Sequence, residues 1–196
     1  MDKRIVAATS NQGKLSEISA LLAAGGWDIV AQSEFGFDDI EETGVTFIEN
    51  ALLKARNACI HTGLAAIADD SGLEVDALLG EPGIHSARYA GDNASNADNI
   101  QKLLKNLASI EPDRRTARFR CVLVYMRHPA DPAPIVSFGT WPGRIIDKPV
   151  GDNGFGYDPV FFVEHLGRTA AQLDASLKNR LSHRGQALRK LKAQLL

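Results

Sequence analysis

The polar segment Thr9-Ser10-Asn11-Gln12-Gly13-Lys14 has the residue types and the position of an anion-binding turn. It follows an apolar stretch and precedes an amphipathic one, so a strand, a short turn and a helix N-terminus are expected. Such a junction directs backbone N–H groups at one point. There Gly13 would allow a phosphate close to the backbone, Lys14 would neutralise it, and Thr9 and Asn11 would donate hydrogen bonds. The segment is not a P-loop, and a plain strand-to-helix turn with a solvated lysine also fits it.

Asp69-Asp70-Ser71-Gly72 follows a second apolar stretch. We expect a strand over residues 64–72 that ends in these acids and a turn, with a further extended run to about Ala77. Ligands of open α/β sheets bind beyond the carboxyl ends of strands. Because successive residues of an extended chain point to opposite sides, one acid should face the site and the other should brace the turn. Mg²⁺ is the usual cation between carboxylates and phosphates, and an Asp-rich turn is the alternative.

Glu41-Glu42-Thr43-Gly44 could supply a further carboxylate to the same metal, although alone it is typical of a solvated acidic loop. Thr46 and Glu49 have the spacing of a capping box, which predicts a helix that runs to about Ile60 and ends near Gly63. On that helix Asn50 and Lys54 lie one turn apart and share a face. That face is either an exposed polar surface or the one from which Lys54 reaches the site.

Two further segments with candidate functional residues lie nearer the C-terminus. In Phe155-Gly156-Tyr157-Asp158-Pro159, glycines beside aromatic rings could expose a ring for stacking on a nucleobase, or a ring could anchor the loop to the core. Lys178 and Ser182-His183-Arg184, taken by themselves, are basic residues of a surface helix. Neither a zinc-type Cys/His spacing nor a nucleophile elbow occurs in the sequence.

Hydrophobic periodicity predicts the elements that must position these residues. Strands are expected at residues 4–9, 27–31, 64–72, 118–126, 133–146 and 160–163. Helices are expected at 14–24, from Thr46 to about Ile60, at 95–108, and from about Ala170 with a break at Ser182. This order predicts an α/β fold with a mixed sheet in one continuous unit.

Composition narrows the function classes. The 196 residues carry a net charge of −2 without a basic run, which argues against a polymeric nucleic acid as partner. The apolar run near the N-terminus is too short for a signal peptide, and no run approaches the ~20 residues of a membrane span. Cys59 and Cys121 lie far apart in apolar contexts, so free thiols and a cytoplasmic location are expected.

Together these segments resemble one family, the inosine triphosphate pyrophosphatase-like enzymes of the bacterial XTP/dITP diphosphatase type. The resemblance covers nearly the whole chain and rests on six ordered strings: ATSNQGKLSE, EETGVTFIENALLKA, AIADDSGLEVDAL, PGIHSARYAG, NGFGYDP and SHRGQAL. It implies a single domain over residues 1–196 with an elongated mixed sheet flanked by helices, two lobes and a central cleft. It also implies a homodimer, Mg²⁺ dependence, and hydrolysis of XTP, ITP or dITP to the monophosphate and pyrophosphate.

The resemblance also assigns roles to residues. Triphosphate binding falls to Thr9, Ser10, Asn11, Gln12, Gly13 and Lys14, although Ser10 stands where many members have glycine. The metal ligands are Glu41 and Asp70, Asp70 is also the proton acceptor, and Ser71 contacts the substrate. The residues that contact the base and sugar of the nucleotide are Phe155, Gly156, Tyr157, Asp158, Lys178, His183 and Arg184. We count Lys54 with Asp70 among the catalytic candidates.

These roles give a mechanism in which water attacks the α-phosphorus and pyrophosphate leaves. Lys178, His183 and Arg184 would donate to the C6 oxygen of hypoxanthine or xanthine, and adenine would leave those donors unpaired. Two other functions remain open at this point. One is a Maf-like pyrophosphatase acting on pyrimidine or modified nucleotides, and the other is a module that binds triphosphates without turnover.

Overall fold

A computed structural model describes residues 4–23 and 25–195 of the chain. The strands are β1 (Arg4–Ala8), β2 (Asp28–Ala31), β3 (Ala65–Val75), β4 (Thr116–Met126), β5 (Ile135–Ile145), β6 (Phe161–Val163) and β7 (Arg168–Thr169). The α-helices are α1 (Gln12–Ala23), α2 (Phe47–Thr62), α3 (Asn96–Asn106), α4 (Ala175–Leu181) and α5 (His183–Leu195). Short 3-10 helices lie at Gln32–Phe35, Asp76–Leu78, Gly83–Arg88, Pro112–Arg114, Glu164–Leu166 and Ala170–Gln172.

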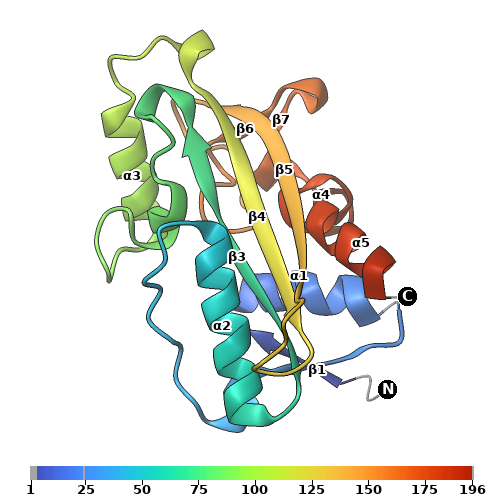
Figure 1. Cartoon of the computed structure of the whole chain (residues 1–196). Coiled ribbons are helices and arrows are strands. Elements are labelled where there is room, and N and C mark those ends of the chain that lie inside the picture. Colours follow the sequence, from blue (N-terminus) through green and yellow to red (C-terminus); the bar gives the residue numbers. More distant parts are fainter. Residues whose placement is uncertain (1–3, 24, 196) are drawn as a thin grey trace. The chain divides into compact units, whose positions relative to one another are not determined.

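The seven strands form one mixed sheet in the order β2-β1-β3-β4-β5-β6-β7 (Figure 1). β1 runs parallel to both β2 and β3, whereas β6 is antiparallel to β5 and to β7. The predicted α/β fold with a mixed, helix-flanked sheet is therefore confirmed.

The chain divides into two compact units. Unit 1 comprises Met1–Asp70, Cys121–Gly139 and Arg184–Leu196, and unit 2 comprises Ser71–Arg120 and Thr140–His183. β3, β4 and β5 each contain one of the boundaries, so these strands contribute residues to both units.

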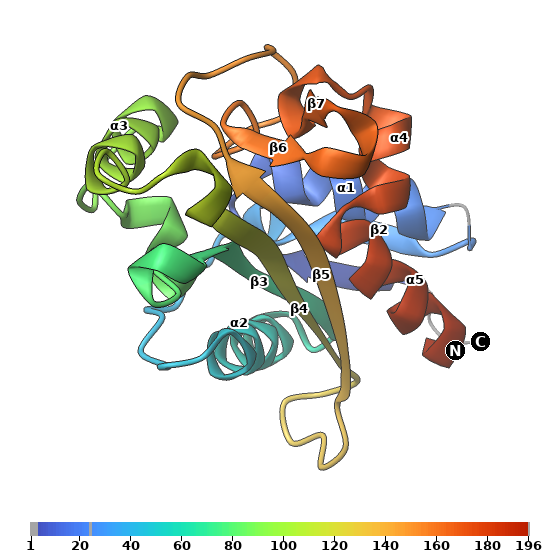
Figure 2. The same cartoon turned by 90° about the horizontal axis from the view of Figure 1, so that it is seen from above.

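Unit 1 has an apolar core on each face of its strands. Val6 and Ala8 of β1 pack with α2, while the alternate residues Ile5 and Ala7 pack with α1 and α5. α2 accordingly lies on one side of these strands, and α1 and α5 lie on the other (Figure 2). The period of two along a strand thus decides which helix each side chain meets.

α2 begins and ends where its sequence predicts. The Thr46 hydroxyl accepts a hydrogen bond from the Glu49 amide at 3.3 Å, and the Glu49 carboxylate accepts one from the Thr46 amide at 2.9 Å. Gly63 ends the helix with φ +67° and donates its amide to the Cys59 carbonyl oxygen. The capping box therefore satisfies amides that the first helical turn leaves without an intrahelical acceptor.

In unit 2, α3 begins after the N-cap Ser95 and packs Ile100, Leu103 and Leu107 into a core formed with β3 and β4. The predicted loop at residues 151–159 is irregular, and Ser182 separates α4 from α5 as expected.

Two predicted boundaries are wrong. β3 does not end at the acidic pair but continues to Val75: β1 pairs with it only as far as Ala68, and β4 is its neighbour on the other side. The first helix begins at Gln12 rather than Lys14, and Ala24, its predicted last residue, lies outside the described residues.

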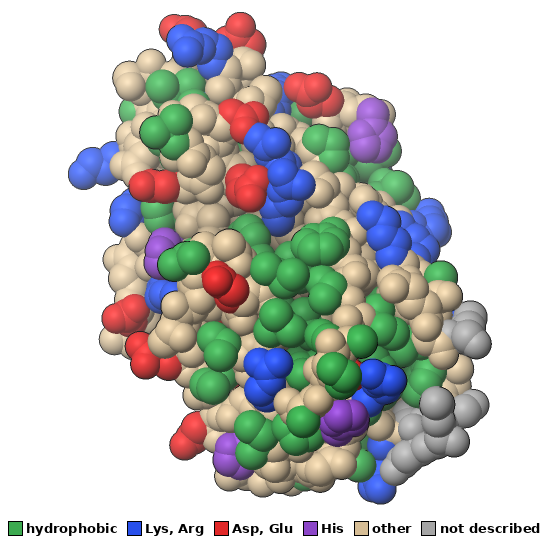
Figure 3. All heavy atoms as spheres, in the orientation of Figure 1, with side chains coloured by type: hydrophobic (Ala, Val, Ile, Leu, Met, Phe, Trp, Pro, Cys, Tyr) green, Lys and Arg blue, Asp and Glu red, His purple; other side chains and the backbone are tan. Residues whose placement is uncertain are grey.

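Acidic and basic side chains are interspersed on the face drawn in Figure 3. Within residues 4–23 and 25–195, no helix has both the length and the apolar character that crossing a bilayer requires.

Leu103→Ala should lower the free energy of unfolding by about 2–5 kcal/mol, because the Leu103 side chain is fully buried and its removal leaves a cavity. Leu79→Ala is the matched control, since Leu79 is 99% exposed and should change stability by less than about 0.5 kcal/mol. Urea unfolding of both variants measures the difference, and equal losses would contradict the packing described for α3.

Candidate active site

The predicted anion-binding turn lies between β1 and α1. The Asn11 amide donates to Thr9 Oγ1 at 3.1 Å, and the Lys14 amide donates to Asn11 Oδ1 at 3.0 Å. Among the described residues, none accepts a hydrogen bond from the amides of Gln12 and Gly13. The helix N-terminus therefore presents two backbone donors with the geometry that binds anions.

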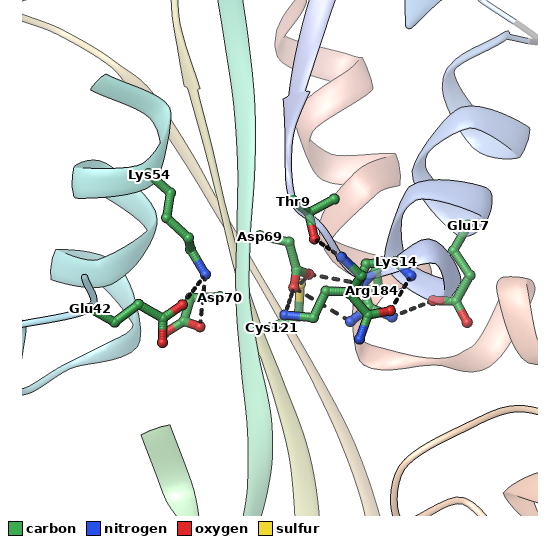
Figure 4. A network of polar contacts seen from close by, with 10 residues as sticks. Thr9, Lys14, Glu17, Glu42, Lys54, Asp69, Asp70, Cys121 and Arg184 are labelled. Carbon is green, nitrogen blue, oxygen red and sulfur yellow. Dashed lines mark hydrogen bonds and ion pairs between the residues drawn. The ribbon is translucent and has the colours of Figure 1, made fainter. Parts of the chain in front are cut away.

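Asp69 and Asp70 lie next to each other in β3 and point to opposite sides of the strand (Figure 4). Their neighbours on the strand follow the same alternation. On one side of β3, Ala66 and Ala68 pack with α2, and Asp70 contacts Lys54 of that helix. On the other side, Ile67 packs with α1 and α5, and Asp69 lies on the same side. The two acids point to opposite sides as expected, but both lie inside the strand, so the prediction that one of them braces a turn is wrong.

On the α1 and α5 side, Asp69 is the centre of a buried ionic network. Its carboxylate lies 2.6 Å from Lys14 Nζ and accepts a hydrogen bond from Arg184 Nε at 2.8 Å. The Cys121 thiol donates to the same carboxylate at 3.0 Å. Arg184 also pairs with Glu17 of α1, so each charge in the network faces an opposite charge.

Burial alone would raise the pKa of Asp69, but the charges of Arg184 and Lys14 and the hydrogen bonds from both residues outweigh it. The pKa of Asp69 is therefore held well below its ordinary value. Burial, and next the charge of Asp69, raise the pKa of the Cys121 thiol well above its usual range. The thiol therefore keeps its proton and remains a hydrogen-bond donor.

On the α2 side, Lys54 lies between two carboxylates. Its ammonium is 2.7 Å from Glu42 Oε1 and 3.2 Å from Asp70 Oδ1. Glu41, the predicted metal ligand, is exposed, and its carbonyl oxygen accepts a hydrogen bond from the Thr43 amide. Glu42 therefore joins the candidate site, whereas the prediction from the acidic loop chose its neighbour Glu41 as the metal ligand.

Burial raises the pKa of Asp70 above its usual value, and the charge of Lys54 only partly offsets this because Glu42 and Asp69 repel a second negative charge. Burial would lower the pKa of Lys54, but Asp70 and Glu42 act on it together and leave that pKa raised. Asp70 combines the raised pKa of a proton acceptor with a fixed cation beside it.

The donor set on this side fits a divalent cation. Asp70 Oδ2 is buried and has no hydrogen-bond partner among the described residues, and such an oxygen is costly unless a ligand satisfies it. The described residues contain no group of three or more His, Cys, Asp or Glu side chains arranged for a metal. One or two protein carboxylates with substrate phosphates are nevertheless the usual environment of Mg²⁺.

The acidic loop is held against the start of α2. Asn50, fully buried, accepts a hydrogen bond from the Gly44 amide at 2.8 Å through its side-chain oxygen. A Cβ at Gly44 would lie 2.6 Å from that oxygen and 2.6 Å from Glu49 Cβ. Glycine is therefore required for the close approach that sets Glu42 beside Lys54.

The remaining predicted residues belong to unit 2, apart from Arg184. Lys178 Nζ lies 2.6 Å from Asp158 Oδ2 and 4.5 Å above the Phe155 ring. The Tyr157 hydroxyl is buried and donates to the Ser86 carbonyl oxygen at 2.8 Å, so this aromatic anchors its loop to the core. His183 is buried and stacks on Phe119 with 4.8 Å between ring centroids.

The loop that carries Phe155 depends on Gly154. This glycine has φ +78°, and a Cβ on it would lie 2.1 Å from Asp158 Oδ2. That same oxygen accepts a hydrogen bond from the Phe155 amide at 2.9 Å. Gly154 therefore permits the turn that joins Asp158 to both Phe155 and Lys178. Within unit 2, Ser71 lies half-buried on β3 directly after Asp70.

Comparison with known proteins decides the family. The model of the Ham1 family matches residues 5–194. The chain belongs to the Ham1 family. A dITP/XTP pyrophosphatase of Vibrio vulnificus (strain YJ016) is 58% identical over 193 residues, which covers 98% of this chain and 96% of that protein.

Two further Ham1-type relatives support this assignment. A dITP/XTP pyrophosphatase of Escherichia coli O157:H7 is 58% identical over 189 residues, which are 96% of each chain. The solved structure of a HAM1 protein from Coxiella burnetii has a TM-score of 0.91 with 50% identity, and 98% of each chain is covered. The resemblance to inosine triphosphate pyrophosphatase-like enzymes and their fold is thereby confirmed.

In this Ham1 family member, Asp69→Asn should lower stability by about 3–5 kcal/mol at pH 7, because it removes one partner of a buried ion pair. The folded pKa of Asp69 lies below its unfolded value of about 3.9, so its contribution is present above that pH and is lost as pH falls through the folded pKa. Asp70, with a raised pKa, acts with the opposite sign.

Urea unfolding at several pH values between 7 and roughly 2.5 measures how the free energy of unfolding depends on pH. This range includes the unfolded pKa of an aspartate, about 3.9. The stability of Asp69→Asn should fall less steeply in acid than that of the wild type. Parallel curves would contradict the network built on Asp69.

Proposed function

We propose that this chain is a Mg²⁺-dependent pyrophosphohydrolase of non-standard purine nucleoside triphosphates, with XTP, ITP and dITP as its substrates. Nucleoside monophosphate and pyrophosphate are the products, so the activity cleanses the nucleotide pool. The observation that carries the proposal is the buried Asp70 carboxylate, which has a raised pKa, an oxygen without a described partner, and a second acid near it across Lys54. The names of the Vibrio and Escherichia relatives support the substrate class.

Glu41 and Asp70 are the residues that would hold Mg²⁺, and Glu42 is a further carboxylate of the same acidic loop. When bound, the cation would neutralise charge on the phosphates and polarise the phosphorus that is attacked. Lys54 forms ion pairs with both Glu42 and Asp70 and offsets one of their two negative charges. We propose that it also keeps these acids in place for catalysis.

The triphosphate tail is negatively charged and needs donors before an oxygen nucleophile can approach it. The segment from Thr9 to Lys14 would supply them, since the amides of Gln12 and Gly13 and the positive end of the α1 dipole favour an anion. Lys14 adds a full positive charge. Its field is one of the influences that lower the pKa of Asp70.

In the proposed step, the oxygen of water forms a bond to the α-phosphorus while the bond from that phosphorus to the bridging oxygen of the β-phosphate breaks. Asp70 orients the water and takes its proton, and pyrophosphate leaves with the bridging oxygen. A raised carboxylate pKa brings the acceptor closer to the operating pH, which favours proton transfer.

On the base side, Lys178 and His183 would donate to the C6 oxygen of hypoxanthine or xanthine, and Phe155 would offer a ring for stacking. Adenine would leave such donors unpaired at a cost of about 1–3 kcal/mol each. Arg184, the third predicted donor, has its Nε and Nη1 groups engaged by Asp69 and Glu17, and its place at the purine edge stays a prediction from the resemblance. Contact of Ser71 and of residues 156–158 with substrate remains a prediction from the resemblance.

Two wider expectations also remain proposals. Homodimer formation rests on the family resemblance. A cytoplasmic location accords with the free thiols of Cys59 and Cys121.

Asp70→Asn should reduce kcat by about 10²–10⁴-fold, because the amide cannot accept the proton of the attacking water. Asp131→Asn is the matched control, since Asp131 is another buried acid of unit 1 and pairs with Arg127 away from the site. Pyrophosphate release from ITP with Mg²⁺ is the measurement. Near wild-type turnover in Asp70→Asn would refute the assignment.

A substrate panel tests the function itself. With Mg²⁺, kcat/KM for ITP and XTP should exceed that for ATP, dTTP and UTP by at least about tenfold, the effect of roughly one unpaired buried donor. In ¹⁸O-labelled water the label should enter the monophosphate. A preference for dTTP or UTP would favour the Maf-like alternative, and binding without pyrophosphate release would favour a non-catalytic module. Chelation of the metal should abolish turnover.

A further inference from the structure

We propose that Asp69 is a positioning residue for Lys14, and that Arg184 holds Asp69 in place for this purpose. The proposal rests on the proposed function, in which Lys14 meets the polyphosphate tail. It gives Arg184 a role within unit 1 in addition to the one that the resemblance implies at the purine edge.

The two oxygens of Asp69 differ in their shortest contacts. Arg184 Nε and the Cys121 thiol both donate to Oδ2, at 2.8 Å and 3.0 Å. Lys14 Nζ lies 2.6 Å from the other oxygen, Oδ1. Oδ1 also accepts a longer hydrogen bond from Arg184 Nη2, at 3.5 Å. Residues of β4 and α5 therefore anchor the carboxylate, and its Oδ1 is directed at the lysine of α1 (Figure 4).

Solvent exposure differs between Lys14 and the two residues that fix its position. The side chains of Asp69 and Arg184 are 0% and 2% exposed, whereas that of Lys14 is 15% exposed. Asp69 and Arg184 are thus enclosed by protein, and the lysine retains access to solvent beside the helix N-terminus. An anion that arrives there can meet Lys14 without opening the rest of the network.

The charges allow this use of Lys14. Asp69 and Glu17 are balanced by Lys14 and Arg184, and Arg184 contacts both acids. When phosphate oxygens take up the ammonium, Asp69 keeps Arg184 and the Cys121 thiol as partners, so it is not left as an unpaired buried charge. A lysine that is already fixed loses less side-chain freedom on binding than a mobile one does.

A double-mutant cycle tests whether Asp69 acts through Lys14. Lys14→Met, Asp69→Asn and the double variant are compared for Kd of inorganic pyrophosphate by calorimetry without turnover, and for KM and kcat with ITP and Mg²⁺. Each single variant should weaken pyrophosphate binding and raise KM by about 10- to 100-fold, the usual effect of a displaced binding group. The double variant should bind pyrophosphate no more weakly than Lys14→Met alone, because Asp69 has no further effect on binding once Lys14 is gone.

Losses that multiply in the double variant would overturn the proposal, since Asp69 would then act independently of Lys14. Unchanged pyrophosphate binding in folded Asp69→Asn would overturn it as well. Asp131→Asn controls for the general effect of losing a buried acid and should leave Kd and KM at wild-type values. If Asp69→Asn does not fold, the cycle is run on Asp69→Asn with Arg184→Met, which removes both buried charges together.

Pyrophosphate carries no base, so its Kd reports the role of Arg184 in holding Asp69 separately from base recognition. In folded Arg184→Met, pyrophosphate binding should weaken as it does in Asp69→Asn, and unchanged binding would overturn the role given to Arg184. Failure of the proposed function is separable from failure of this inference. A protein that releases no pyrophosphate from any triphosphate would refute the function, whereas the calorimetric cycle would still decide the link between Asp69 and Lys14.

Discussion

The alternation of side chains along β3 is the constraint on which the candidate site depends. Two adjacent aspartates in an extended strand cannot face the same helix, so Asp69 meets α1 and α5 while Asp70 meets α2. One acid is surrounded by two cations and a thiol, and the other shares one lysine with a second acid. The opposite pKa shifts of the two acids follow from these surroundings.

In the proposed function, this division gives one strand a structural acid, Asp69, and a catalytic acid, Asp70. The charge of Asp69 is stabilised by Arg184, Lys14 and the Cys121 thiol. Asp70 has a raised pKa and an oxygen without a hydrogen-bond partner in the described part of the chain, features that lower stability and are retained where a site needs a reactive group. The anion-binding turn and the acidic loop lie on different sides of β3, and charge still couples them because Lys14 acts on the pKa of Asp70.

Features set by local chemistry could be predicted from the sequence, and features set by distant contacts could not. The capping box of α2 involves residues three apart and was found from spacing alone. The turn expected at Ser71-Gly72 is absent because the sheet formed with the neighbouring strand β4 overrides local turn preference. The Arg184–Asp69 pair joins residues 115 apart in sequence, so no spacing rule indicated it. Glu41 was chosen over Glu42 in a loop without periodicity, where neither the facing side nor the partner can be read from the pattern.

The most direct test is a carboxyl ¹³C NMR titration of the metal-free protein, with Asp69 and Asp70 assigned from the two Asn variants. The account predicts that Asp70 titrates above the ordinary aspartate pKa of about 3.9, while Asp69 stays ionised well below it. Titration of both carboxyls together near the ordinary value would contradict the claim that β3 gives its two acids different chemistry.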